Sequence, residues 1–139
     1  MTYLTTEDMA AFLDEREIAA LKRDYEADGT DKLPIGISYA ENYVKDRLAF
    51  KYDLATEYGK IEANRSTTLL EILAHIAIWK LCATFPTVQL DGKRHYNYEQ
   101  ALKDLDKIAR GELGSTIPLK ATAKEAIQWG TTNQTDVIY

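Results

Sequence analysis

LLEILAHIAIWKLCATF, residues 69–85, is the stretch that decides the fold, because it is apolar on nearly every side. Its 17 residues include Glu71, His75 and Lys80, whereas a membrane span needs about 20 residues with few or no charges. A helix of this length extends about 26 Å, roughly the depth of a small domain. We therefore expect a central core helix, which the pair Thr68 and Glu71 would begin as a capping box.

The segment before it, IGISYAENYVKDRLAFKYDL from Ile35, has the spacing of an amphipathic helix with two apolar stripes. The first stripe consists of Ile37, Ala40, Val44 and Leu48, and the second of Tyr39, Tyr43 and Phe50. The second stripe lies about 140° from the first around a helix of 3.6 residues per turn. Two interpretations are open: the helix is covered on both sides by its own domain, or the aromatic stripe contacts a neighbouring subunit.

Further helices are expected at both ends of the chain. Thr5 and Asp8 form a capping-box pattern at the start of the first helix. The segment RHYNYEQALKDLDKIARGEL from Arg94 predicts the last helix, with Asn97 as its N-cap and Gly111 as its end. Its apolar stripe consists of Tyr98, Ala101, Leu102, Leu105, Ile108 and Ala109.

These patterns predict an all-α fold, a small bundle of four to five helices around a central apolar helix. Residues 53–67 show no clear period and are expected to form a long loop. Residues 1–113 form the helical domain, and residues 114–139 form a C-terminal tail that is not a separate domain. The tail keeps apolar residues, which indicates that it docks on its own domain or on a partner.

The net charge of −5 argues against direct binding of nucleic acid, which needs a basic surface. The start of the chain lacks the basic and apolar regions of a signal peptide, so we expect the protein in the cytoplasm in which it is made. The single cysteine, Cys82, lies in the apolar stretch and is expected to be a buried, unreactive thiol.

No motif points to catalysis, a cofactor or a small-molecule substrate. The chain has no G-x-G-x-x-G, no P-loop and no G-x-S-x-G. Glu71, His75 and Cys82 share one side of the core helix, which could suggest a metal site, but zinc normally needs four ligands in a recognised spacing. We expect instead a neutral histidine beside a buried thiol. We assign no catalytic, cofactor-binding or metal-binding residue, and expect no enzyme.

The cluster Lys93, Arg94 and His95 is locally basic. A contact with nucleic acid is one interpretation. In an acidic chain, pairing with acidic groups, on this chain or on a neighbour, is the interpretation that we favour.

The order of these segments, from about Tyr3 to Leu119, resembles the Mu-type family of tailed-phage head-to-tail connector, or neck, proteins. The segment ending in RLAFKYDL, the apolar helix and YEQALKDLDKIARGEL carry the likeness. The resemblance implies a virion structural protein that forms a ring, typically of twelve subunits, beneath the portal. It would close the filled capsid and join it to the tail, in the virion neck, after assembly in the host cytoplasm.

The partners that the resemblance implies are further copies of the chain, the portal protein and a tail or stopper protein, with no membrane. DNA would only pass through the ring, and an acidic subunit would bind it weakly. The residues expected at the subunit interface are Tyr39, Tyr43, Phe50, Tyr58, Lys93 and Arg94. Those expected to dock on the portal or a neighbour are Trp129, Val137, Ile138 and Tyr139.

A second hypothesis needs no virion. The chain would then be a small cytoplasmic helical adaptor or regulator that binds one protein partner through the same apolar tail.

Overall fold

A computed structural model describes residues 3–28, 32–84, 89–112 and 117–120, with the side chains of residues 22–28 left aside. This part of the chain is helical and contains six α-helices, so the predicted all-α fold is confirmed. The elements are α1 (Thr6–Met9), α2 (Glu15–Asp28), α3 (Leu33–Leu48), α4 (Leu54–Tyr58), the 3₁₀ turn η1 (Glu62–Asn64), α5 (Thr67–Thr84) and α6 (Gly92–Arg110).

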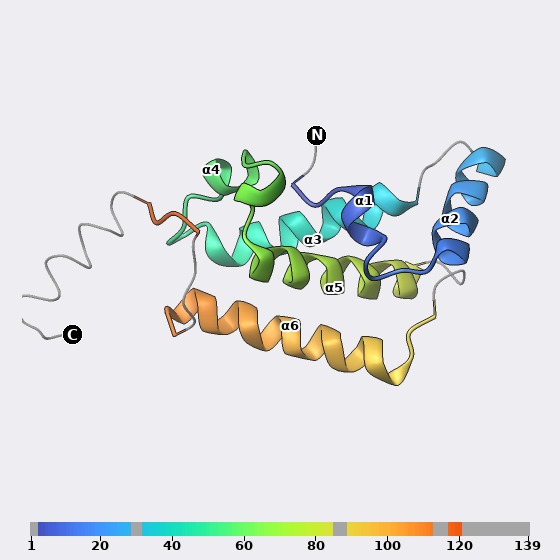
Figure 1. Cartoon of the computed structure of the whole chain (residues 1–139). Coiled ribbons are helices and arrows are strands. Elements are labelled where there is room, and N and C mark those ends of the chain that lie inside the picture. The colour runs from blue at the N-terminus through green and yellow to red at the C-terminus, as the bar shows by residue number, and fades with distance from the viewer. Residues whose placement is uncertain (1–2, 29–31, 85–88, 113–116, 121–139) are drawn as a thin grey trace, which may run out of the picture.

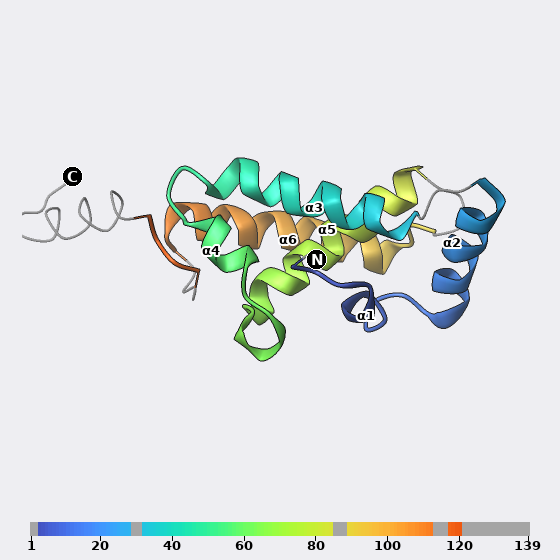
Figure 2. The ribbon, with the colours of Figure 1, turned by 90° about the horizontal axis from the view of Figure 1, so that it is seen from above.

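The three long helices α3, α5 and α6 form the body of the bundle (Figure 1). Helix α5 contacts α3 and α6 along much of its length, whereas α3 and α6 contact each other at few places. Figure 2 shows α2 across the end of the bundle where α3 begins, and α4 near the end where α3 finishes. The apolar stretch is therefore the central helix, as predicted.

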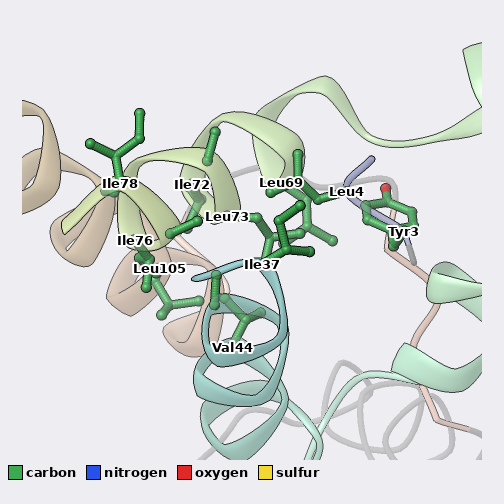
Figure 3. Packing of buried hydrophobic residues seen from close by; sticks show 14 of the residues in the cluster. Tyr3, Leu4, Ile37, Val44, Leu69, Ile72, Leu73, Ile76, Ile78 and Leu105 are labelled. Carbon is green, nitrogen blue, oxygen red and sulfur yellow. The ribbon is translucent and has the colours of Figure 1, made fainter. Parts of the chain in front are cut away.

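Helix α5 supplies eight of the buried side chains, and they pack against α3, α6 and the N-terminal segment (Figure 3). They are Leu69, Ile72, Leu73, Ala74, Ile76, Ala77, Ile78 and Leu81. Within the described residues, α5 is long and apolar enough to cross a membrane by length and composition. A core helix passes the same test, and burial between two helices explains why α5 is apolar on most sides.

Helix α3 buries the first of its two predicted stripes completely, since Ile37, Ala40, Val44 and Leu48 are each at most 1% exposed. Gly36 allows the close approach of α3 to α5. A Cβ atom at Gly36 would lie 2.7 Å from Leu81 Cγ and 3.0 Å from the Ala77 carbonyl oxygen. A residue with a side chain would therefore push the two helices apart.

The start of α5 differs from the prediction. Ser66 is the N-cap: its Oγ accepts a hydrogen bond from the Leu69 amide at 3.3 Å, and its carbonyl accepts one from Leu70 at 3.0 Å. Thr68 and Glu71 are exposed residues inside the helix. The capping-box prediction placed the start two residues too late.

The start of α6 is also earlier than predicted. Asp91 is the N-cap and accepts a hydrogen bond from the Arg94 amide at 2.8 Å, so Asn97 lies inside the helix. The end was predicted correctly, because Gly111 adopts the left-handed conformation, with φ of 76°. The predicted capping box of Thr5 and Asp8 at α1 is confirmed as well.

Residues 53–67 were expected to be a long loop, and this prediction was wrong. Asp53 caps α4 by accepting a hydrogen bond from the Thr56 amide at 3.1 Å, and η1 follows before α5. The segment is folded because two of its own side chains, Leu54 and Glu57, are buried in the domain.

Part of the predicted tail lies on the helical domain. Residues 117–120 run antiparallel to residues 51–53 in an isolated β-bridge between Tyr52 and Leu119. The Asp53 amide donates to the Pro118 carbonyl at 2.7 Å, and the Lys120 amide donates to the Lys51 carbonyl at 3.0 Å. Ile117 is 4% exposed and belongs to the core.

Candidate interaction surfaces

Four aromatic side chains form a continuous row across α3, α5 and α6, which we call the aromatic row: Tyr43, Tyr39, Trp79 and Tyr98. Neighbouring ring centroids are 6.0 Å apart between Tyr43 and Tyr39 and 6.3 Å apart between Tyr39 and Trp79. Trp79 and Tyr98 stack with centroids 4.8 Å apart and planes inclined by 8°. Stacked aromatic pairs add about 0.5–1.5 kcal/mol beyond the area that they bury.

Cations lie over the α3 end of this row. The Arg47 guanidinium carbon is 3.4 Å from the centroid of the Tyr43 ring, and Lys80 Nζ is 4.7 Å from that of Tyr39. Phe50 follows three residues after Arg47 and is 68% exposed. The row therefore combines half-buried aromatics and cations, and the exposed Phe50 follows just beyond the end of α3. These are the residue types enriched at protein interfaces.

The second predicted stripe divides into two parts, because α3 ends at Leu48 and Phe50 lies beyond it, whereas the sequence pattern had placed Phe50 on the helix. Tyr39 and Tyr43 are half-buried, and their own chain covers them through Trp79 and Arg47. Phe50 remains largely bare. The first interpretation, cover by its own domain, describes the two tyrosines, and the exposed surface beyond them keeps the second interpretation open.

On the other side of α3, the N-terminal segment is held by a buried polar cluster. Glu57 is 0% exposed. It accepts a hydrogen bond from the Tyr3 hydroxyl, and another from the Ser66 amide at 3.2 Å. Lys60 Nζ lies 2.9 Å from Glu57 Oε1, but at an angle that does not make a hydrogen bond. The Ser66 amide also donates to the Tyr3 hydroxyl oxygen at 2.7 Å, which closes the network.

Arg65 ties the same segment to the turn before α5. Its guanidinium donates to both carboxylate oxygens of Asp8, with an Nη2 to Oδ1 distance of 3.1 Å, and to the Tyr3 carbonyl at 2.9 Å. Partial burial tends to raise the pKa of Asp8, but hydrogen bonds from Arg65 and Thr5 outweigh it and lower the pKa overall. Asp8 is therefore held in its charged form.

Two further contacts join this cluster to α3. The Leu4 amide donates to Glu41 Oε2 at 2.9 Å, and the Tyr58 hydroxyl donates to the Glu41 carbonyl at 2.8 Å. Burial raises the pKa of both Glu41 and Tyr58 above their ordinary values. The pKa of Tyr3 is also raised, first by burial and then by its hydrogen bond to Glu57. Tyr58, predicted at a subunit interface, thus packs mainly inside its own chain.

A cavity of about 320 Å³ opens beside this cluster, between the N-terminal segment and the turn before α5. Its lining is mainly apolar and includes Tyr3 and Ile61, and Ile61 is 57% exposed. Glu7 and Glu62 are exposed at its rim. Its cations are already engaged, since Arg65 pairs with Asp8 and Lys60 lies beside Glu57.

The basic cluster at the start of α6 is divided by the fold. Arg94 pairs with Glu17 of α2 through two contacts of 2.8 and 2.6 Å, so an acidic partner is present on the same chain. Lys93 and His95 are exposed, and His95 lies 3.6 Å from Glu99. The other predicted docking residues, Trp129, Val137, Ile138 and Tyr139, lie outside the described residues.

Glu71, His75 and Cys82, which were considered and not assigned as a metal site, are spread along α5. His75 packs edge-on against Phe12 with ring centroids 5.3 Å apart, and burial lowers its pKa. Cys82 is half-buried, and burial raises the pKa of its thiol, which opposes reactivity. Among the residues that the structure describes, no group of three or more metal-ligating side chains converges.

Sequence reasoning missed the buried cluster and the continuation of the aromatic row through Trp79 and Tyr98. A helix that is apolar nearly all round has no distinct face, so its pattern did not show where Trp79 points. Tyr98 carried a usable signal, because it begins the apolar stripe of α6. The pairing of Tyr3 with Glu57 joins residues 54 positions apart, and no local pattern shows it.

The fold defines a small all-α protein with candidate interaction surfaces on two sides of α3. A family model for bacteriophage Mu Gp36 matches residues 3–132, nearly the whole chain. The chain belongs to this family of phage proteins. Neither the curated proteins nor the solved structures contain a match.

Proposed function

We propose that this protein is a head-to-tail connector of a phage or prophage virion. Copies of the chain form a ring beneath the portal, close the DNA-filled capsid and join it to a tail or stopper protein. The protein works by assembly in the virion neck and carries out no catalysis. Its subunits are made in the host cytoplasm.

Membership of the Mu Gp36 family is the observation that carries this proposal. The surface supports it, because it combines the half-buried rings and cations of the aromatic row with the exposed Phe50 beyond the end of α3. A lasting ring needs neighbour contacts of at least about 1,200–2,000 Å². The row, Phe50 and the cavity beside the N-terminal segment are the candidate areas for those contacts.

The experiment is to measure assembly of the full chain, alone and with the portal protein encoded in the same genome. Light scattering after size exclusion, over a concentration series and at two salt levels, gives the mass, and negative-stain imaging shows the shape. A ring, alone or on the portal, is the expected result. A chain that stays monomeric and does not bind the portal would contradict the proposal and favour the adaptor hypothesis.

The paired variant Tyr43→Asp with Phe50→Asp tests the surface. We expect it to stay a helical monomer by circular dichroism and to fail to assemble, since two charges would be buried at the contact. The matched control is Tyr96→Asp with Leu90→Asp, which changes exposed apolar side chains near the start of α6. Unchanged assembly in the first variant would remove the aromatic surface from the interface.

A further inference from the structure

The aromatic row and the cavity lie on opposite sides of the same helix. Glu41 is two residues from both Tyr39 and Tyr43, which places it about 160° from each around α3. Glu41 faces the N-terminal segment, where it accepts the hydrogen bond from Leu4, whereas Tyr39 faces Trp79. A subunit with two different surfaces on opposite sides can associate head to tail, and such contacts close into rings.

The two surfaces are complementary in shape. Phe50 projects from the end of α3 with 68% of its surface exposed. The cavity of about 320 Å³ is at the lower end of the size range of binding pockets, and Ile61, which is 57% exposed, offers it an apolar side chain. It is large enough for one aromatic ring.

The two surfaces are also complementary in charge. Arg47, which is exposed and lies one turn before Phe50, makes that end of α3 basic. Glu7 and Glu62 make the rim of the cavity acidic, because its two cations are engaged by Asp8 and Glu57. The backbone of Glu62 is fixed, since its carbonyl accepts a hydrogen bond from Arg65 Nε at 2.9 Å.

We propose that the occupant of this cavity is a second copy of the chain. Phe50 of one copy enters the cavity and packs against Ile61 of the next, and Arg47 pairs with Glu62 at its rim. This contact is head to tail. It rests on the proposed function only for its role, which is to hold neighbouring subunits together in the ring. It can therefore be tested separately from binding to the portal.

Charge reversal tests the pairing of the two surfaces. We expect Arg47→Glu and Glu62→Lys each to weaken self-association by about tenfold or more, because a like-charge contact replaces an opposite-charge one. Lys103→Glu, on the exposed face of α6, is the matched control and should leave association unchanged. Light scattering over a concentration series measures each dissociation constant.

Two combinations test whether residue 47 of one copy lies against residue 62 of another. The double variant Arg47→Glu with Glu62→Lys has both charges reversed, so its copies should associate as the wild type does. An equimolar mixture of the two single variants should also associate, because each copy then finds the opposite charge on both neighbours. A double variant as weak as the single variants would overturn the proposal.

Cross-linking detects the contact even when association is weak. Phe50→Cys in one batch and Ile61→Cys in another, both carrying Cys82→Ser, should form a mixed dimer with a short thiol-specific cross-linker. Only background cross-linking in the mixture would overturn the proposal. A mixed dimer from a chain that does not bind the portal would support the contact while contradicting the connector function.

Discussion

The two sides of α3 are built from different chemistry. On one side, Glu57 is fully buried and hydrogen-bonded to Tyr3 and Ser66, and Glu41 of α3 accepts a further hydrogen bond from the Leu4 amide. On the other side, the half-buried rings of Trp79 and Tyr98 stack, and the exposed Phe50 follows the end of α3. A buried polar network fixes the fold because each lost partner is costly, whereas half-buried aromatics leave area for a partner. Helix α3 thus separates a structural side, which holds the buried network with the cavity beside it, from a candidate interaction side, which holds the aromatic row.

The largest effect on stability is expected at Glu57. We expect Glu57→Ala to lower the free energy of unfolding by about 3 kcal/mol, because the Tyr3 hydroxyl and the Ser66 amide lose a buried acceptor. Urea unfolding followed by circular dichroism measures the change. A loss below about 1 kcal/mol would show that the network is not what holds the N-terminal segment. Tyr3→Phe combined with Glu57→Ala should show coupling between the two side chains.

Asp8 makes the stability of the structural side depend on pH. Because its pKa is lowered in the folded state, its contribution to stability is present above its unfolded pKa and is lost as the pH falls through the folded value. At pH 7 we expect Asp8→Asn to cost about 1 kcal/mol, through weaker pairing with Arg65. The stability difference between variant and wild type should shrink on acidification below about pH 4. A difference that stays constant with pH would contradict this role.

On the interaction side, the stacked pair tests how much the row stabilises the monomer. Tyr98→Leu keeps an apolar side chain but removes the stack on Trp79, and we expect a loss of about 1 kcal/mol in the free energy of unfolding. In a Trp129→Phe background, Trp79 fluorescence reports the loss of the stack, and urea unfolding measures the loss of stability. Tyr98→Phe is the control, because it retains the ring and should match the wild type within about 0.5 kcal/mol.

The smallest effect on stability is expected at Phe50. Since the ring is 68% exposed, Phe50→Ser should change the free energy of unfolding by less than about 0.5 kcal/mol. The same variant should weaken self-association, which thermal unfolding and light scattering measure separately. A large loss of stability with normal assembly would place Phe50 on the structural side instead.

Sequence reasoning located the long helices well but placed their starts poorly. For α6, Asp91 and Asn97 are both suitable N-caps, and nothing local separates them. The pairing of Arg94 with Glu17 of α2 accompanies the earlier start. For α5, Ser66 and Thr68 are both suitable N-caps. Ser66 is the one used, and its amide donates a hydrogen bond to the Tyr3 hydroxyl. Both decisions involve residues distant in the sequence.

The candidate surfaces were predicted in part. Tyr39, Tyr43 and Phe50 were found because they share a stripe of a periodic helix, but their division into covered and bare rings depends on where Trp79 lies. Arg94 was expected to find an acidic partner, and it does so within its own chain. The cavity had no sequence signal, because two segments about 55 residues apart form its walls.

The sequence by itself determined the all-α fold, the central apolar helix, the buried stripe of α3 and the glycine that ends α6. These features depend on local periodicity and backbone preference, which neighbouring residues carry. Only the tertiary structure decided that residues 53–67 fold over a buried Glu57, that residues 117–120 pair with residues 51–53, and that α3 has an aromatic side and a cavity side. These features depend on contacts between distant segments, which burial in one shared core brings together.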